Sequence, residues 1–268
     1  MADWIAVGLG KFAHAVLASR RRIALDNLRR AFKDEKSEDE LKRITRLVFI
    51  NISRTVIEFA RIPRLNKERL GRLIPEYSGS EHLEQVYKEG KGSVMMTGHF
   101  GNWELLAAWT RGMGYPVHLL VGRQHNPYVD GYLARLRKSM DVGITSVGVG
   151  ARQIMRLLKE NNLVAMVADQ HSASAATRVE FFGRPAATPS GPAAFAVKLD
   201  CPLLFGYIVR EAYNRHRVVV EPPIYPPKSG DREKDILDVT QQHTDLLEKA
   251  IRKYPDQWMW THRRWKID

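Results

Sequence analysis

Cysteine is nearly absent from this sequence of 268 residues, because only Cys201 is present. A single cysteine excludes any disulfide within the chain. In the segment KLDCPLLF it precedes an apolar run, so we expect it in the core. Metal-binding patterns are missing too: no cysteine pair and no His-x3-His pair occurs, and His125 and His171 have no motif around them. We therefore expect neither a structural zinc nor a catalytic one.

Long hydrophobic runs are also missing. The most apolar stretch is WIAVGLGKFAHAVL, residues 4–17, which contains Lys11 and His14. It is shorter than the ~20 residues that a spanning helix needs. No basic region precedes it and no small-residue cleavage site follows, so it does not have the form of a signal peptide. We expect an amphipathic surface helix, or the tail of a longer helix that this chain lacks.

Acidic residues are too few to balance the basic ones. The sequence has 42 Lys and Arg against 30 Asp and Glu, a formal charge of +12. Such an excess favours an anionic partner: nucleic acid, anionic lipid or an acidic protein or substrate. The last cluster, HRRWK, lies beside Trp258, Trp260 and Trp265. Those indoles suit either a membrane interface or packing of the C-terminus, and the sequence leaves both open.

The apolar content of 44% is sufficient for a real core, and its pattern indicates the fold class. Helical periodicity covers residues 4–32, and a second helix runs from the Ser37/Glu40 capping box to about Ile62, before Pro63. Strands are predicted near 93–97, 117–122, 144–147, 163–168, 179–182, 203–209 and 217–221. Helices are predicted near 81–89, 103–112, 127–139, 151–160, 190–199 and 233–253. The alternation predicts an α/β fold with a mostly parallel sheet flanked by helices. We divide it into a helical extension, 1–62, and an α/β domain, 63–268.

The stretch SVMMTGHFGNWELLAAW, residues 93–109, is the most informative segment. A strand ends at Thr97, and His99 and Glu104 follow at the turn into a helix. In the turn, Gly98 and Gly101 permit a tight path that brings the two side chains together. Glu104 would then hold one ring nitrogen of His99, leaving the other to take a proton from a hydroxyl. The alternative is a structural histidine and a glutamate that stabilises the helix N-terminus.

Seven segments in order resemble the bacterial lipid A biosynthesis acyltransferases, within the wider glycerolipid acyltransferases marked by His-x4-Asp/Glu. The segments cover nearly the whole chain: RRRIALDNLRRAF, TVIEFARIPRL, GHFGNWELLA, NPYVDGYLARLRKSMDVG, AMVADQHS, VEFFGRPAATPSGPAAFA and WMWTHRRWK. The resemblance implies transfer of a fatty acyl chain from a thioester to a lipid hydroxyl. It makes His99 the base and Glu104 its orienting group, with direct attack and no acyl-enzyme.

The same resemblance implies further site residues. Arg137 would stabilise the oxyanion or hold an acceptor phosphate, with Arg135 as the competing assignment. Arg123 and Arg184 are expected to contact phosphate, and the alternative for each arginine is a solvated surface position or rigid loop. Two more residues complete the expected binding site. Asp169 ends an apolar strand at the edge where α/β sites form, and Asn102 is expected to shape the site.

The implied donor is acyl carrier protein or coenzyme A, used as a co-substrate without any bound cofactor. The implied acceptor is a phosphorylated lipid A precursor, at the cytoplasmic face of the bacterial inner membrane. Acyl carrier protein, phospholipid and acceptor are all anionic, so the basic charge suits them. Two alternatives stay open: the same chemistry on another glycolipid or phospholipid, or a basic membrane- or nucleic-acid-binding protein without activity. No nucleic-acid-binding motif is present, so we expect no such partner.

Overall fold

A seven-stranded sheet organises the molecule in the computed structural model, which describes residues 2–61, 66–122, 126–146 and 151–266. The strand order is β1-β9-β8-β2-β5-β3-β4, and only the β8–β9 pair is antiparallel. The strands are β1 Glu76–Ser78, β2 Ser93–Thr97, β3 Val117–Val121, β4 Gly143–Ser146, β5 Leu163–Val167, β8 Leu203–Ala212 and β9 Arg215–Val220. The expected α/β fold with a mostly parallel sheet is confirmed.

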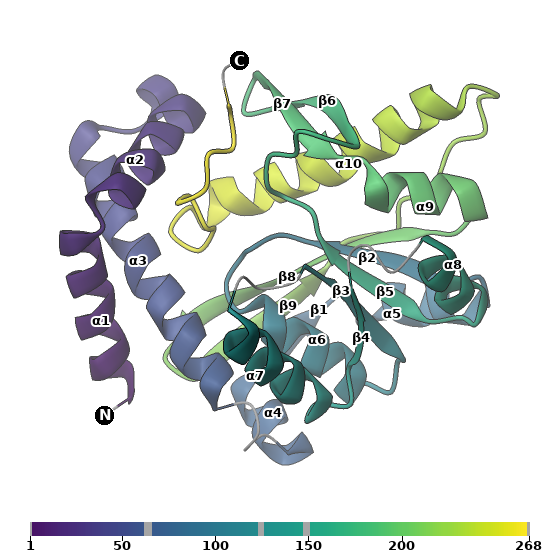
Figure 1. Cartoon of the computed structure of the whole chain (residues 1–268), viewed down its shortest axis with the longest axis horizontal. Coiled ribbons are helices and arrows are strands. Elements are labelled where there is room, and N and C mark those ends of the chain that lie inside the picture. The colour runs from purple at the N-terminus through teal and green to yellow at the C-terminus, as the bar shows by residue number, and fades with distance from the viewer. Residues whose placement is uncertain (1, 62–65, 123–125, 147–150, 267–268) are drawn as a thin grey trace.

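Helices cover both faces of this sheet, which explains why the central strands are continuous apolar runs. In β2, Val94 and Met96 point to one face and Met95 to the other, as strand alternation requires. Figure 1 shows α10 and α9 on one side of the sheet and α6 and α7 on the other. These helices are α4 Lys67–Leu73, α5 Ser80–Lys88, α6 Trp103–Gly112, α7 Pro127–Lys138, α8 Ala151–Lys159, α9 Gly191–Leu199 and α10 Arg232–Lys253.

The N-terminal region forms α1 (Ala2–Val16), α2 (Ala18–Phe32), a short 3-10 turn (Lys33–Glu35) and α3 (Glu38–Ala60). The helical character expected over residues 4–32 is confirmed, and the region divides into two helices because Leu17 leaves helical geometry with ψ of 60°. The capping box of Ser37 and Glu40 at the start of α3 is confirmed. Gly10 lets α1 approach α3 closely, since a Cβ there would lie 2.5 Å from the Ile50 Cα.

A separate two-stranded hairpin, β6 (Ala176–Phe181) and β7 (Arg184–Pro189), packs beside α10 and the C-terminal segment (Figure 1). The sequence suggested a Gly/Pro-rich loop where β7 lies. Prolines are compatible with β7 because a two-stranded sheet leaves edge positions that need no hydrogen bond. The C-terminal tryptophans pack into the core: Trp260 is fully buried and Trp258 nearly so. The prediction that these indoles pack the C-terminus onto the core is therefore correct, and the alternative that they lie at a membrane interface is wrong.

Cys201 is a core residue, as expected, and burial raises the pKa of its thiol to about 11. Among the described helices, none combines the length and apolar character needed to cross a membrane. The division at residue 62 stays a prediction. The helical extension nevertheless contacts the predicted site directly, because the Thr55 hydroxyl in α3 donates a hydrogen bond to the Gly101 carbonyl oxygen, 2.9 Å away.

Candidate active site

The turn that carries His99 joins β2 to α6 at the carboxyl edge of the sheet. The C-terminal segment fixes the turn through its backbone: the Gly101 N–H donates to the Gln257 carbonyl, and the Met259 N–H donates to the His99 carbonyl. Gly101 has a φ of +54°, and a Cβ there would lie 1.9 Å from the Ile208 carbonyl oxygen. Only glycine fits at this point.

Asp169 is the carboxylate that holds His99. The Oδ1 atom of Asp169 lies 2.7 Å from the ring Nδ1, and its Oδ2 accepts the His99 backbone N–H at 2.7 Å. Oδ2 also accepts the indole N–H of Trp258 at 2.7 Å. Because β2 and β5 pair in parallel, with Thr97 opposite Val167, the residues two positions after each strand come level. Those residues are His99 and Asp169.

The pKa values of the pair follow from this geometry. Burial alone would raise the pKa of Asp169, but His99 and the two N–H donors outweigh burial and lower it to about 2. Burial alone would lower the pKa of His99, but the Asp169 carboxylate outweighs burial and raises it above 6.5. Asp169 is therefore ionised at neutral pH. It favours the protonated imidazole that forms when His99 accepts a proton.

Glu104 does not make the expected hydrogen bond to His99. Its carboxylate accepts two hydrogen bonds from Arg137 of α7, from Nη2 at 2.7 Å and from Nε at 3.2 Å. Both side chains are largely buried, and their bidentate pairing explains why Glu104 is directed toward α7. Its charge still reaches His99 and raises the pKa of the imidazole, although less than Asp169 does. The carboxylate that contacts a ring nitrogen of His99 is therefore Asp169, and not Glu104 as the sequence suggested.

Asn102 is fully buried, and its predicted part in the binding site stays a prediction. Its Oδ1 accepts the Leu105 N–H at the start of α6, and its Nδ2 donates to Glu58 Oε2 at 2.9 Å. These two bonds fix the start of α6 next to the turn that carries His99. The residue that anchors it, Glu58, was not singled out by the sequence.

Glu58 belongs to a buried ionic cluster between α3 and the β8–β9 hairpin. Arg210 donates to both carboxylate oxygens, at 2.6 and 3.1 Å, and His216 Nε2 lies 3.4 Å from Oε1. Burial alone would raise the pKa of Glu58, but His216 and Arg210 outweigh burial and lower it to about 2. The cluster joins α3, β8 and β9 to the Asn102 cap, and so supports the turn that carries His99.

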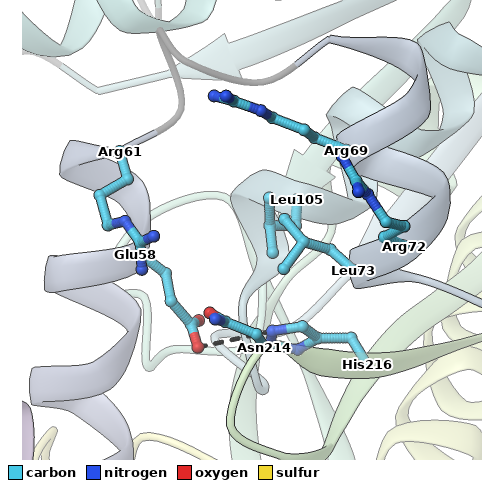
Figure 2. A pocket seen from close by; sticks show the side chains of 8 residues that line it. All are labelled: Glu58, Arg61, Arg69, Arg72, Leu73, Leu105, Asn214 and His216. Atoms are coloured by element: carbon cyan, nitrogen blue, oxygen red, sulfur yellow. Dashed lines mark ion pairs between the residues drawn. The ribbon is translucent and has the colours of Figure 1, made fainter. Parts of the chain in front are cut away.

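A cavity of about 500 Å³ opens beside this cluster. Figure 2 shows Glu58 turned toward His216 at its base, with Leu73 and Leu105 in the middle and arginines around them. Its lining residues are Glu58, Arg61, Arg69, Arg72, Leu73, Leu105, Asn214 and His216. Neither His99 nor Asp169 is among them, so this cavity is separate from the histidine–aspartate pair.

The remaining predicted arginines have different positions. Arg184 donates from Nε to the Arg30 carbonyl of α2 at 3.1 Å, so it ties the β6–β7 hairpin to α2. Its predicted phosphate contact stays a prediction. Arg123 lies outside the described residues. Arg135 is exposed on α7, whereas Arg137 is largely buried against Glu104, and the role predicted for either arginine stays a prediction. No cluster of three metal-ligating side chains occurs within the described ranges.

The ring nitrogen of His99 that faces away from Asp169, Nε2, is accessible. Its side chain is 23% exposed, and its Nε2 has no hydrogen-bond partner in the described part of the chain. The ring lies edge-on to Trp103, with centroids 5.0 Å apart. The cavity that directly touches the ring has a volume of only about 10 Å³. The open route to Nε2 is therefore from the exposed side of the ring.

An imidazole held by a buried carboxylate at the carboxyl edge of a parallel sheet is suited to general-base chemistry. The family described as bacterial lipid A biosynthesis acyltransferase matches residues 1–267, and the chain belongs to this family of acyltransferases. The confirmed family assignment agrees with the seven sequence segments.

Curated relatives give the range of named activities. The chain is 25% identical over 216 residues to the phosphatidylinositol mannoside acyltransferase of Mycobacterium tuberculosis (strain ATCC 25618 / H37Rv), covering 79% of this chain and 66% of the relative. It is 25% identical over 265 residues to the lipid A biosynthesis lauroyltransferase of Escherichia coli (strain K12), covering 97% of this chain and 83% of the relative. The palmitoleoyltransferase of that strain is 24% identical over 264 residues, or 96% of this chain and 82% of the relative.

Proposed function

We propose that this protein transfers a fatty acyl chain from an acyl thioester to a hydroxyl group of a lipid A precursor, with His99 as the general base and Asp169 as its orienting carboxylate. The observation that carries the proposal is the 2.7 Å contact between Asp169 Oδ1 and His99 Nδ1, which leaves Nε2 accessible. With Nδ1–H donated to Asp169, Nε2 is the nitrogen that can accept a proton.

The reaction then proceeds in two steps. Nε2 of His99 takes the proton of the acceptor hydroxyl while the hydroxyl oxygen adds to the thioester carbonyl carbon. The resulting tetrahedral intermediate expels the thiolate by breaking the carbon–sulfur bond, and the thiolate takes the proton from the imidazolium. The products are an ester and a free thiol. Asp169 stabilises the imidazolium that exists between the two steps. No covalent acyl-enzyme forms.

Arg137 is the candidate for the oxyanion or for an acceptor phosphate. Glu104 uses two of its N–H groups, Nε and Nη2, and so fixes the plane of the guanidinium. A guanidinium carries five N–H donors, so others stay available. In this proposal, Glu104 acts through Arg137 rather than through His99. The buried Glu104–Arg137 pair is a preorganised charge of the type that stabilises a developing oxyanion.

We further propose that the protein binds the cytoplasmic face of the bacterial inner membrane through α1. The inward side of this helix packs on α3 through Ala6 and Gly10, which are buried. Its outward side exposes a row of apolar side chains: Trp4, Ile5, Leu9, Phe12 and Val16. Exposed Arg20 and Arg22 follow on α2, where basic groups would meet anionic headgroups.

Acyl carrier protein is the proposed donor and coenzyme A the alternative, because both present the acyl group as a thioester and both are anionic. The second acceptor candidate is a mannosylated phosphatidylinositol, or another glycolipid or phospholipid. It is favoured by the named activity of the mycobacterial relatives, while the lipid A precursor is favoured by the E. coli relatives, which match nearly the whole chain.

The test is acyl transfer by the purified full chain. Acyl carrier protein and coenzyme A thioesters of several chain lengths are incubated with a panel of hydroxylated lipids, and products are identified by mass. His99→Ala should lower turnover by about 10²–10⁴-fold. His82→Ala, on the distant helix α5, serves as the matched control and should leave turnover unchanged. Full turnover by His99→Ala, or no transfer by the wild type to any acceptor, would contradict the proposal.

A further inference from the structure

Arg264, in the C-terminal segment, is a cation buried without a counter-ion. Its side chain is 0% exposed and its guanidinium lies 4.9 Å over the Phe181 ring. Its two terminal nitrogens donate to the Ala187 carbonyl and the Thr188 hydroxyl, both neutral acceptors. Its Nε finds no acceptor in the described ranges, and Asp169, whose charge acts on the guanidinium, forms no ion pair with it. Burying a charge in this way is costly unless an anion compensates for it.

A cavity of about 200 Å³ adjoins this guanidinium. That volume is several times the ~30 Å³ of a water molecule. The lining residues are His171, Arg178, Pro185, Ala186, Ala187, Arg264, Trp265 and Lys266, with no acidic side chain. Arg178 and Lys266 are exposed cations at its rim. The indole N–H of Trp265 is a second buried donor without an acceptor in the described part of the chain.

The cavity lies beside the candidate active site. His171 follows Asp169 by two residues, and its backbone N–H donates to His262 Nε2 at 2.8 Å. Asp169, His99 and Arg264 are all close enough for their charges to influence the pKa of His262, which burial lowers to about 4. His171 and His262 therefore connect the lining of this cavity to the His99–Asp169 pair.

We propose that this cavity binds a phosphate group of one of the two substrates, and that Arg264 is its buried ligand. The inference rests on the proposed function, in which both the thioester donor and the lipid acceptor carry phosphate. A planar guanidinium matches a phosphate in geometry and charge. Arg178 and Lys266 at the rim add positive charge, and the Arg264 Nε and the Trp265 indole N–H are donors that still lack an acceptor within the described residues.

The arginines of the larger cavity in Figure 2 make a weaker case. Arg72 is 69% exposed and pairs with Glu68, and Arg61 donates to the Tyr213 hydroxyl. Solvent reaches exposed Arg72, which also has an acidic partner, whereas Arg264 is shielded from solvent and its two hydrogen-bond acceptors are neutral. The burial of a cation that forms no ion pair within the described residues is what points to the smaller cavity.

Binding is tested first without catalysis. Inorganic phosphate is titrated into the full chain, with acetate as the carboxylate control, and the Trp265 indole signal is followed by NMR. We expect phosphate, and not acetate, to shift this signal. Arg264→Gln should weaken phosphate binding roughly 10- to 100-fold, the range for a charge-assisted hydrogen bond. Arg178→Ala/Lys266→Ala should weaken it several-fold, and Arg72→Ala, outside the cavity, should not change it.

If Arg264→Gln does not fold, the rim double variant decides. The proposal would be overturned if the folded variants Arg264→Gln and Arg178→Ala/Lys266→Ala bound phosphate as tightly as the wild type. It would also be overturned if the Trp265 signal did not respond to phosphate. If the wild type binds phosphate at this cavity but transfers no acyl chain, the subsite stands and the proposed function fails. The two failures are therefore distinguishable.

Kinetics then identify which substrate supplies the phosphate. The donor arm compares acyl coenzyme A with the acyl thioester of N-acetylcysteamine, which has no phosphate. The acceptor arm compares a phosphorylated lipid with its dephosphorylated form. In one of the two arms, Arg264→Gln should raise the KM of the phosphate-bearing substrate roughly 10- to 100-fold and change kcat little. The KM of the phosphate-free analogue in that arm should not change. The assignment of Arg264 as a phosphate ligand would be overturned if Arg264→Gln changed KM equally for each substrate and its phosphate-free analogue in both arms.

Discussion

Replacing Asp169 by asparagine removes the carboxylate charge beside His99 and leaves the size of the side chain unchanged. Oδ2 of Asp169 accepts two N–H groups, from the His99 backbone and from Trp258. The amide oxygen of the variant must take that position, because the alternative would place an NH2 group against two donors. The amide NH2 then faces His99 Nδ1, which in the wild type lies 2.7 Å from Oδ1.

This exchange reverses the tautomer of His99. With an NH2 donor opposite Nδ1, Nδ1 must accept and Nε2 must carry the hydrogen, so Nε2 can no longer take a proton from a hydroxyl. The same change in the serine-protease triad lowers kcat about 10⁴-fold through the wrong tautomer. We therefore expect Asp169→Asn to lower kcat by about 10³–10⁴-fold, with KM changed much less.

The pH dependence provides an independent readout. A base acts only when it is neutral, so the wild-type rate should fall as pH drops through the His99 pKa, which lies above 6.5. Burial lowers the pKa of His99, and Asp169 is the largest opposing influence. Removing the Asp169 charge should therefore lower the pKa of His99, and the acid limb of the residual activity should move to lower pH.

The assay is steady-state acyl transfer between pH 5 and 9, with thermal unfolding as the check on folding. Glu104→Gln is the matched control, since it also converts a carboxylate near His99 to an amide. Because Glu104 contacts Arg137 instead, its variant should move the acid limb less than Asp169→Asn does. Asp169→Asn with kcat within tenfold of the wild type, or a larger shift of the acid limb in Glu104→Gln, would refute the assignment.

Three further predictions concern the frame of the site. Folding lowers the pKa of Glu58 from 4.5 to about 2, so its ionised form contributes roughly 3 kcal/mol to stability above pH 4.5, and this contribution is lost as pH falls toward 2. Glu58→Gln should therefore lower the unfolding free energy at pH 7 and lower it much less at pH 3. Gly101→Ala should lower stability by at least about 1–3 kcal/mol in denaturant titration and reduce turnover, because the new Cβ would lie 1.9 Å from a backbone oxygen. The double variant Trp4→Ser/Phe12→Ser changes two side chains that are 81% and 65% exposed. It should weaken flotation of the protein with anionic vesicles and leave turnover on a detergent-solubilised acceptor unchanged. Unaltered flotation would argue against α1 as the anchor.

Sequence patterns located the central strands because buried parallel strands are continuous apolar runs with turn residues at their ends. The prediction for β2, residues 93–97, agrees with its observed bounds. The patterns failed where this signal is absent. All three residues of β1, Glu76–Ser78, are exposed, and β7 contains Pro185 and Pro189. Neither strand is apolar enough to be distinguished from a loop.

The candidate site was predicted in part for a related reason. His99 and Asp169 were both singled out because each follows an apolar strand, but the sequence does not state which strands are neighbours. The pairing of β2 with β5 joins segments 70 residues apart, and it alone brings the two side chains level. Glu104 was a plausible partner only while the positions of α7 and Arg137 were unknown. The indole of Trp258 gave no sequence signal of its contact with Asp169.

The two carboxylates near His99 act on it differently because each has its own cationic or proton-accepting partner. Asp169 is paired with the imidazole, and Glu104 with Arg137. With a neutral imidazole, the two carboxylates outnumber the single guanidinium, so the largely buried quartet carries one excess negative charge. Uptake of the hydroxyl proton by His99 brings the quartet to neutrality. In surroundings of low dielectric constant, this change favours the imidazolium, and it does so at the moment when a negative oxyanion forms on the substrate. A second carboxylate that contacts only the arginine therefore strengthens the base without competing for its nitrogen.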